Sequence, residues 1–183
     1  MLQDVADRRE RFESLAAEVY EPLQRYVRRR IHRDAADDIV AETMLTLWRR
    51  LDVVPPDARL LWAYGVARRH LANQRRAAGR RARLASRIEA EPTSTFETDH
   101  PYDAELQAAL SDLSDTDREL LRLWAWERLE PAEMGPVLGI TANAAAIRLH
   151  RAKKKLGRNL ETGRKNGGLS GHSKAVSQKE DRS

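Results

Sequence analysis

The segment from Glu130 to Leu156 carries the signals for two helices joined by a tight turn, and it restricts the local fold more than any other part of the chain. Pro131 suits the first turn of a helix, where its missing N–H is not needed. Gly139 can adopt the left-handed backbone that ends a helix, and Thr141 can cap the next helix. We therefore predict a helical hairpin with a short connection.

The second helix of this hairpin combines one apolar stripe with one basic face. The stripe follows helical spacing and should face the core; it consists of Ala145, Leu149, Ala152 and Leu156. The exposed positions are then Asn143, Ala146, Arg148, Arg151, Lys153 and Lys154. This is the layout of a helix-turn-helix, in which the second helix enters the DNA major groove. An ordinary helical hairpin with a solvated basic face is the alternative.

Basic residues are concentrated in two stretches with an acidic stretch between them, although the net charge of the 183 residues is only +5. Ala63–Arg87 has eight arginines and no acid, and Arg148–Lys165 has eight basic residues and one acid. Glu89–Glu119 holds ten acids and one arginine. Two basic surfaces on one chain indicate two contacts with one polyanion. Arginine-rich helices that are merely solvated are the alternative.

Helical periodicity also governs the first half of the chain. The apolar stripe of Phe12–Ile31 is interrupted at Pro22, where we expect a kink or the start of a second helix. A strongly amphipathic helix is expected over Asp34–Leu51, with acids at its N-terminus that suit the helix dipole. A third helix should begin at about Ala58 and run into the arginine-rich stretch.

These patterns predict an all-α protein of two small helical domains joined by a flexible acidic linker. The first domain spans residues 10–87, the linker 88–104 and the second domain 105–160. In the second domain, Ser114 is suited to cap a helix, with Asp117 three residues later. From Gly157 onward the chain is too rich in Gly, Ser and Lys to bury a core, so residues 161–183 are expected to form a disordered basic tail.

One acidic group could be a metal or acid–base site: Asp34, Asp37, Asp38 and Glu42. No His or Cys completes a ligand set there, so an exposed ridge that docks a protein is favoured. The chain contains no cysteine and no phosphate-binding glycine loop, and we expect neither catalysis nor a cofactor. No apolar run is long enough to span a bilayer, and the N-terminus is too polar for a signal peptide, so we expect a cytoplasmic protein without membrane insertion.

Three segments, in this order, resemble the extracytoplasmic-function (ECF) sigma factors, a subfamily of the sigma-70 family of RNA polymerase subunits. Asp34–Leu51 resembles the region 2 helix that docks on the clamp helices of the polymerase β′ subunit. Trp62–Arg76 resembles the helix that engages the −10 promoter element. Glu105–Leu156 resembles region 4, whose helix-turn-helix reads the −35 element. Together these motifs cover roughly Phe12–Leu160.

The resemblance implies a subunit that directs the polymerase core to specific promoters and assists initiation. It implies as partners the polymerase core (β′ clamp helices and β flap), promoter DNA and an anti-sigma factor, with nucleoid association when bound to polymerase. The residues implied to face polymerase are Asp37, Asp38, Ile39, Val40 and Glu42. Those implied on the −10 side are Trp62, Tyr64, Arg68, Arg69, Asn73, Arg75 and Arg76. Those implied on the −35 side are Thr141, Asn143, Ala144, Arg148, Arg151 and Lys153.

Two details of the −10 side follow from the same resemblance and from residue chemistry. The loop Val54–Arg59 would help capture an unstacked base as the duplex opens. The ring of Tyr64 is suited to stack on such a base in single-stranded DNA. The chain also departs from the family pattern at Arg69, Asn73, Pro136 and Ala145.

Two other functions fit parts of the same sequence. A helix-turn-helix regulator that binds duplex DNA without polymerase would account for the C-terminal half, but leaves Asp34–Leu51 and Ala63–Arg87 unexplained. A metal-dependent nucleic-acid enzyme that uses the acidic group would lose its activity on addition of a chelator.

Overall fold

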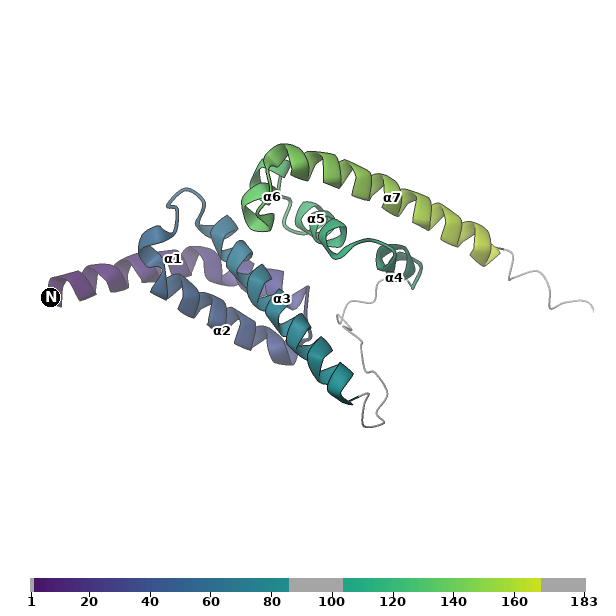
Figure 1. Ribbon diagram of the computed structural model, residues 1–183. Helices are drawn as coiled ribbons and strands as arrows, with labels where there is room; N and C mark the ends of the chain where they lie inside the picture. Colours follow the sequence, from purple (N-terminus) through teal and green to yellow (C-terminus); the bar gives the residue numbers. More distant parts are fainter. Residues whose placement is uncertain (1, 86–103, 169–183) are drawn as a thin grey trace, which may run out of the picture.

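The computed structural model describes residues 2–85 and 104–168, and within these ranges every regular element is a helix (Figure 1). The elements are α1 (Leu2–Arg28), α2 (Arg33–Arg49), the 3-10 turn η1 (Leu51–Val53), α3 (Arg59–Ala85), α4 (Ala104–Ser111), α5 (Asp115–Ala125), α6 (Pro131–Leu138) and α7 (Ala142–Gly168). The predicted all-α class is confirmed.

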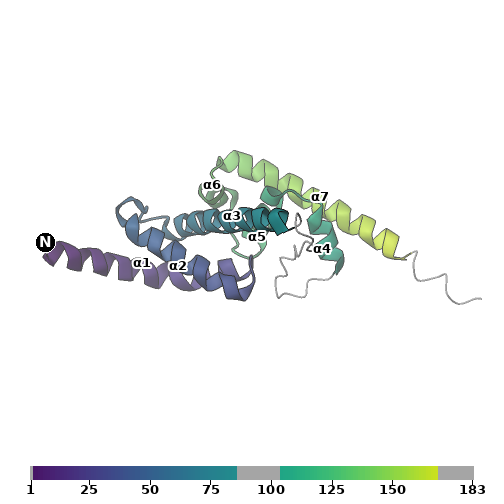
Figure 2. The ribbon, with the colours of Figure 1, turned by 60° about the horizontal axis from the view of Figure 1, so that its bottom comes forward.

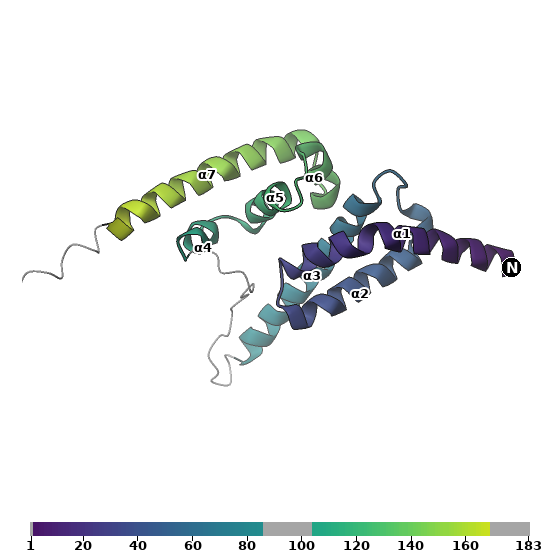
Figure 3. The ribbon, with the colours of Figure 1, turned by 180° about the vertical axis from the view of Figure 1, so that it is seen from behind.

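In the N-terminal unit, α1 and α2 lie side by side and both contact α3 (Figure 3). The predicted apolar stripe of α1 is buried, with Leu15, Val19, Leu23 and Val27 each at most 1% exposed. Pro22 lies inside α1, so no second helix begins there. The helix continues because the apolar positions before and after the proline pack into the core, and such tertiary packing outweighs local propensity.

The boundaries of α2 and α3 agree closely with the sequence prediction. α2 has Asp34 in its first turn, where the carboxylate faces the positive end of the helix dipole. η1 and a short loop containing Pro55 and Pro56 follow, and α3 begins at Arg59, one residue after the expected start. The loop between α2 and α3 therefore lies beside the start of α3.

Three helix starts in the C-terminal unit use the residues that the sequence predicts. The Ser114 hydroxyl accepts a hydrogen bond from the Asp117 N–H at 3.1 Å at the start of α5. The Thr141 hydroxyl accepts one from the Ala144 N–H at 3.1 Å at the start of α7. Pro131 occupies the first turn of α6. Each side-chain cap contributes about 1 kcal/mol to helix stability.

The turn between α6 and α7 depends on two glycines. Gly139 ends α6 with φ of 70°, a left-handed conformation that side chains other than glycine rarely adopt. A Cβ on Gly135 would lie 2.8 Å from the Ile140 carbonyl oxygen, so only glycine allows this close approach. Pro136 is accommodated inside α6 without ending the helix. The predicted helix-turn-helix geometry is thus present.

The predicted disorder of residues 161–183 is wrong for its first part, because α7 continues to Gly168. The extension is supported by contacts between α7 and α4. Lys155 Nζ donates a hydrogen bond to the Asp112 carbonyl at 2.6 Å, and Asn159 Nδ2 donates one to the Ala109 carbonyl at 2.9 Å. Composition alone does not reveal these side-chain-to-backbone bonds. Residues 169–183 lie outside the described part of the chain.

The two units are packed against each other, chiefly through α3 and α6 (Figures 1 and 2). One apolar cluster takes buried residues from both units, among them Tyr64 from α3 and Met134 and Val137 from α6. At Gly65, a Cβ would be only 3.7 Å from the Pro136 and Val137 carbonyl oxygens, so the two helices are in close contact. The sequence predicts two helical units but not this shared core. Apart from Ala104, the predicted linker lies outside the described residues.

Candidate nucleic-acid interface

The outer face of α7 is the most complete candidate surface for DNA. Four of the residues predicted there have exposed side chains, namely Asn143, Arg148, Arg151 and Lys153. The stripe on the opposite side is buried: Ala145 is 0% exposed and Ala152 1%. Burial of one side fixes the rotation of α7 about its axis, so the amide and cationic groups project together toward solvent.

The remaining two residues predicted on this side have local structural roles. The hydroxyl of Thr141 caps α7 through the N–H of Ala144, and the side chain of Ala144 is half-buried. Lys153 also packs on the C-terminal unit, since its Nζ lies 3.5 Å from the centre of the Trp124 ring. Trp124 is itself 47% exposed. These contacts orient the N-terminal half of α7, the part that enters a groove in helix-turn-helix proteins.

The residues predicted on the −10 side all lie on α3, but they do not share one exposed surface. Arg69, Asn73 and Arg76 are exposed, and Arg76 donates a hydrogen bond to Asn73 Oδ1 at 2.6 Å. Trp62, Arg68 and Arg75 are half-buried. Arg59, at the end of the predicted capture loop, pairs with Glu18 at 3.2 Å.

Tyr64 is enclosed rather than exposed, with 5% of its surface accessible. Its ring stacks on that of Tyr26, with 4.5 Å between the ring centres and 20° between the planes. Burial raises the pKa of Tyr64 to about 12. In this arrangement of the two units its ring is not available to a base.

The residues predicted to face polymerase divide into two groups on α2. Asp37, Asp38 and Glu42 are exposed and form an acidic ridge. Ile39 and Val40 are 3% and 4% exposed and pack in the core, so their side chains hold the helix in place rather than form the ridge. The Arg28 Nη2 lies 3.7 Å from Asp37 Oδ1 at one end of the ridge.

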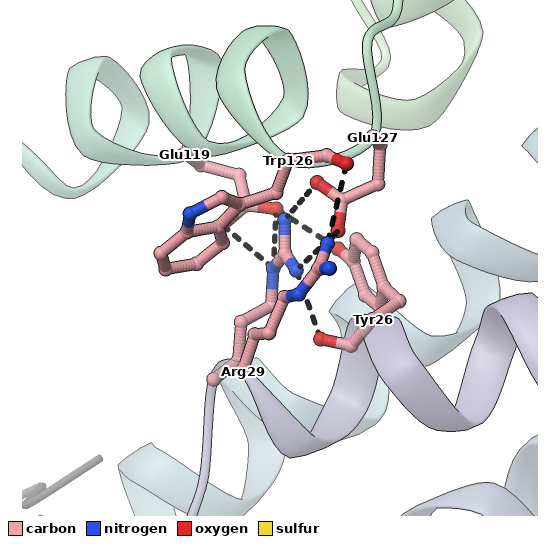
Figure 4. Close-up of polar contacts among 6 residues, drawn as sticks. Tyr26, Arg29, Glu119, Trp126 and Glu127 are labelled. Atoms are coloured by element: carbon pink, nitrogen blue, oxygen red, sulfur yellow. Dashed lines mark hydrogen bonds and ion pairs between the residues drawn. The ribbon is translucent and has the colours of Figure 1, made fainter. Parts of the chain in front are cut away.

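A buried polar cluster between the two units was missed by the sequence analysis (Figure 4). Arg30, next to the C-terminus of α1, is 2% exposed, and its Nε lies 2.9 Å from Glu119 Oε1 on α5. Its Nη2 lies 3.1 Å from Glu127 Oε2, in the loop after α5. The Tyr26 hydroxyl donates to Glu119 Oε1 at 2.9 Å. We define Arg30, Glu119 and Glu127 as the interdomain ion cluster.

In this cluster two carboxylates face the Arg30 guanidinium, and Arg29 adds a second positive charge 3.7 Å from Glu127 Oε1. Burial acts to lower the pKa of Arg30, but the carboxylate of Glu119 and the other groups around the guanidinium raise it above its ordinary value. Burial and the neighbouring Glu119 together raise the pKa of Tyr26 well above its ordinary value. Arg30 therefore stays charged and Tyr26 stays protonated, which keeps the bonds to Glu119 intact. Pairs that lie 89 and 97 residues apart leave no periodic signal in the sequence.

Two solvent-filled clefts lie beside the interdomain ion cluster. One, of about 440 Å³, lies between α3 and α5 and is lined by Arg68, Arg69, Arg75 and Arg76 of α3 and by Asp115 and Thr116 of α5, among others. The other, of about 510 Å³, lies mainly over α4 and α5 and is lined largely by apolar side chains together with arginines. The arginine side of α3 thus borders open space, unlike the side that carries Tyr64.

In the described ranges, 2–85 and 104–168, no three His, Cys, Asp or Glu side chains are grouped so that they could hold a metal ion. None of the helices in these ranges has the length and apolarity that crossing a membrane requires.

Comparison with known proteins identifies relatives of one kind. The family model "Sigma-70, region 4" matches residues 103–156. The ECF RNA polymerase sigma factor SigL of Mycobacterium tuberculosis is 31% identical over 127 residues, which are 66% of this chain and 72% of that protein. The match to SigL extends well beyond the region 4 segment.

Solved structures support the same fold. The sigma factor RpoE of Bartonella quintana, in complex with the anti-sigma factor NepR, has a TM-score of 0.61 at 21% identity and covers 82% of this chain and 96% of that one. CnrH, in complex with the cytosolic domain of CnrY, has a TM-score of 0.56 at 25% identity and covers 82% of this chain and 88% of that one. PhyRSL of Sphingomonas sp. Fr1, in complex with NepR, has a TM-score of 0.58 at 16% identity and covers 93% of this chain and 96% of that one.

Proposed function

The chain belongs to the ECF subfamily of sigma-70 RNA polymerase sigma factors, and from this premise we propose that it directs the polymerase core to promoters through three surfaces of its own. The observation that carries the proposal is the presence, on one chain, of the basic face of α7, the arginine side of α3 and the acidic ridge of α2. Neither the basic face of α7 nor the arginine side of α3 alone distinguishes a sigma factor from another DNA-binding protein.

On α7, we expect Asn143 to bond a base edge in the −35 element, because its side chain is exposed near the N-terminus of the helix. Arg148, Arg151 and Lys153 follow along the same exposed side, where they are suited to phosphates. Thr141 and Ala144 act on this surface through the cap that orients the helix. We therefore expect sequence reading from Asn143 and salt-dependent affinity from the cations.

On α3, the exposed Arg69, Asn73 and Arg76 are the residues best placed to meet DNA at the −10 element, with Arg68 and Arg75 at the edge of the same cleft. Trp62 and the loop Val54–Arg59 lie at the N-terminal end of this helix, where an unstacked base would be captured. Tyr64 can take part only if its surroundings change, because its ring is buried.

On α2, the acidic ridge of Asp37, Asp38 and Glu42 is the proposed contact with the clamp helices of the polymerase β′ subunit. In the described ranges the ridge residues do not belong to any group of three His, Cys, Asp or Glu side chains that could hold a metal ion. The polymerase core would supply the chemistry, and this subunit would supply binding and position without catalysis of its own. We further propose regulation by an anti-sigma factor, which is supported by the structural neighbour RpoE, whose structure includes the anti-sigma factor NepR.

A helix-turn-helix regulator that works without polymerase is the second candidate, favoured only by the complete α6–α7 motif. Equilibrium titration of fluorescently labelled protein with purified polymerase core separates the two candidates. The sigma proposal expects a stable complex that forms without DNA. Asp38→Lys combined with Glu42→Lys should weaken it by at least about tenfold, since each reversal replaces an attraction by a repulsion of about 1 kcal/mol or more.

The matched control is Asp7→Lys combined with Glu10→Lys, which makes the same change in charge at two exposed positions of α1. If both double variants weaken the complex equally, the ridge is not the contact. If the unmodified protein does not bind the core at all, the proposed function is wrong. An enzymatic activity of the purified protein on nucleic acid that is lost on addition of chelator would instead favour the metal-dependent enzyme.

A further inference from the structure

Ile147 on α7 is an apolar residue in the middle of the proposed −35 surface. It is 45% exposed, and among the side chains of α7 that the structure describes it is the one large apolar residue on the exposed side. It lies two positions from Ala145 and two from Leu149, which are 0% and 6% exposed. An α-helix turns by about 100° per residue, so this spacing directs Ile147 away from the core. Its hydrocarbon therefore faces outward and fills no gap in the interior.

Ile147 also lies in one row with two residues that we assign to DNA. Asn143 precedes it by four positions and Arg151 follows it by four, and both are exposed. Side chains four positions apart lie above one another on the same side of a helix. Single exposed apolar side chains are common on protein surfaces, but this one lies between a residue proposed to read a base and a residue proposed to bind phosphate. When α7 enters the groove, Ile147 is therefore directed at the base edges.

The chemistry of the major groove determines which base suits such a side chain. Thymine displays an apolar group there, its C5-methyl, whereas the groups by which the other bases are read are hydrogen-bond donors and acceptors. Contact between Ile147 and the methyl removes hydrocarbon of both partners from water, but contact with a donor or acceptor leaves that polar group without a partner. The β-branch restricts the isoleucine to one preferred χ1 rotamer in a helix, so the contact costs little side-chain entropy. Ile147 thus favours thymine over the other bases.

We propose that Ile147 is a specificity-determining residue of the −35 contact and that it selects a thymine by packing on the C5-methyl group. The proposal rests on the proposed function, because it names part of the sequence that α7 reads. Four residues advance an α-helix by about 6 Å, and consecutive base pairs lie about 3.4 Å apart. The selected thymine, on either strand, should therefore lie within about two base pairs of the base that Asn143 reads.

Deoxyuridine in place of thymidine tests this contact, because the exchange removes the C5-methyl and leaves the hydrogen-bonding groups of the base unchanged. The complex of polymerase core with this protein is titrated with promoter duplexes that carry uridine at one −35 position at a time. We expect one position at which uridine weakens binding by about three- to fivefold, which corresponds to the loss of one buried methyl group. Uridine at the other thymine positions should change binding by less than this factor.

Substitution of Ile147 shows whether this side chain is the partner of the methyl. Ile147→Ala should weaken binding to the thymine duplex and abolish the effect of uridine, since the methyl then has no partner. Alanine has the higher helix propensity, so α7 stays helical in this variant. Ile147→Val keeps the β-branch and should keep at least about half of the uridine effect. The matched control is Val5→Ala, which shortens another exposed apolar side chain, on α1, and should keep the whole effect.

Two results overturn the proposal and leave the proposed function intact. One is equal affinity for the thymine and uridine duplexes at every −35 position. The other is a uridine effect of the same size in the unmodified protein and in Ile147→Ala, because a different group would then read the methyl. A uridine effect that is lost in Ile147→Ala and kept in Val5→Ala supports the contact.

Failure of the proposed function is a separate result. If the unmodified protein directs the polymerase core to no promoter, the proposed function is wrong, and the uridine comparison is made on duplexes that the protein alone selects from a random pool. Loss of the uridine effect in Ile147→Ala on those duplexes would still support the thymine contact. If the protein selects no duplex from the pool, the thymine contact is overturned as well.

Discussion

The imidazole of His70 on α3 contacts the carboxylate of Glu42 on α2, with 2.9 Å between Nδ1 and Oε2. The other ring nitrogen, Nε2, lies 3.2 Å from the hydroxyl of Thr46 on α2. One histidine of the proposed −10 helix is therefore fixed at both nitrogens by the helix that carries the acidic ridge. The proposed DNA surface and the proposed polymerase surface are in direct contact through this side chain.

His70→Ala should affect the orientation of Glu42 more than the stability of the fold. The Glu42 side chain is 60% exposed, and exposed ion pairs contribute at most about 1 kcal/mol. We expect a loss of less than about 1 kcal/mol in urea unfolding and a drop of less than about tenfold in affinity for the polymerase core. His150→Ala, an exposed position on α7, is the control for core binding. Core affinity equal to that of the unmodified protein would show that His70 does not position Glu42.

Gly135→Ala should destabilise the C-terminal unit by about 1–3 kcal/mol, because the new Cβ would meet the Ile140 carbonyl oxygen at 2.8 Å. Chemical unfolding followed by circular dichroism measures the loss. Gly79→Ala is the matched control: it meets nothing within 4 Å and lies inside α3. That control should gain up to about 1 kcal/mol from the higher helix propensity of alanine. Equal stability of the two variants would contradict the tight turn.

Such local features of the C-terminal unit are those that the sequence predicts well. Ser114, Pro131, Gly139 and Thr141 each act within a few residues of their position in the chain, so residue type and spacing suffice to assign them. The apolar stripe of α7 is also correct, since a period of 3.6 residues determines which side is buried.

Features that depend on distant parts of the chain could not be predicted in this way. Tyr64 was assigned to the −10 side from the family resemblance of Trp62–Arg76 and from its aromatic ring. The ring is buried in an apolar cluster that includes residues of α6, which follows some seventy residues later. Arg30 lies in an ordinary basic cluster of the sequence, and only the folded chain brings Glu119 to it. The length of α7 was misjudged for the same reason, and of the two alternatives at Pro22 the start of a second helix is wrong: tertiary contacts outweigh local propensity.

Two substitutions on α7 should separate base reading from phosphate binding. Asn143→Ala should cost about 1–3 kcal/mol on the preferred −35 sequence and little on other sequences, because a side chain that bonds a base edge discriminates between bases. Arg148→Ala should weaken binding to all sequences alike and reduce the salt dependence by about one counterion. Titrations of labelled duplexes at several salt concentrations measure both effects. If the two variants behave identically, the division of roles is wrong.

Alkaline pH should weaken the packing of the C-terminal unit against the N-terminal unit, which buries Tyr64. Burial raises the pKa of Tyr64 to about 12, whereas an exposed tyrosine ionises near about 10. A raised pKa in the folded state means that Tyr64 contributes stability below about pH 10 and that this contribution is lost as the pH rises through about 12. Tyrosinate absorbance, compared between the unmodified protein and Tyr64→Phe, follows the ionisation. Ionisation of Tyr64 near pH 10 in the folded protein would contradict its burial.

Run-off transcription on a library of promoter fragments, with mapping of the 5′ ends of the transcripts, is the decisive test of promoter recognition by this protein. Purified polymerase core is assayed with and without this protein. We expect discrete start sites, each at a fixed distance from a shared pair of upstream elements, and only when the protein is present. Start sites that are the same with and without the protein would contradict its assignment as a promoter-directing subunit.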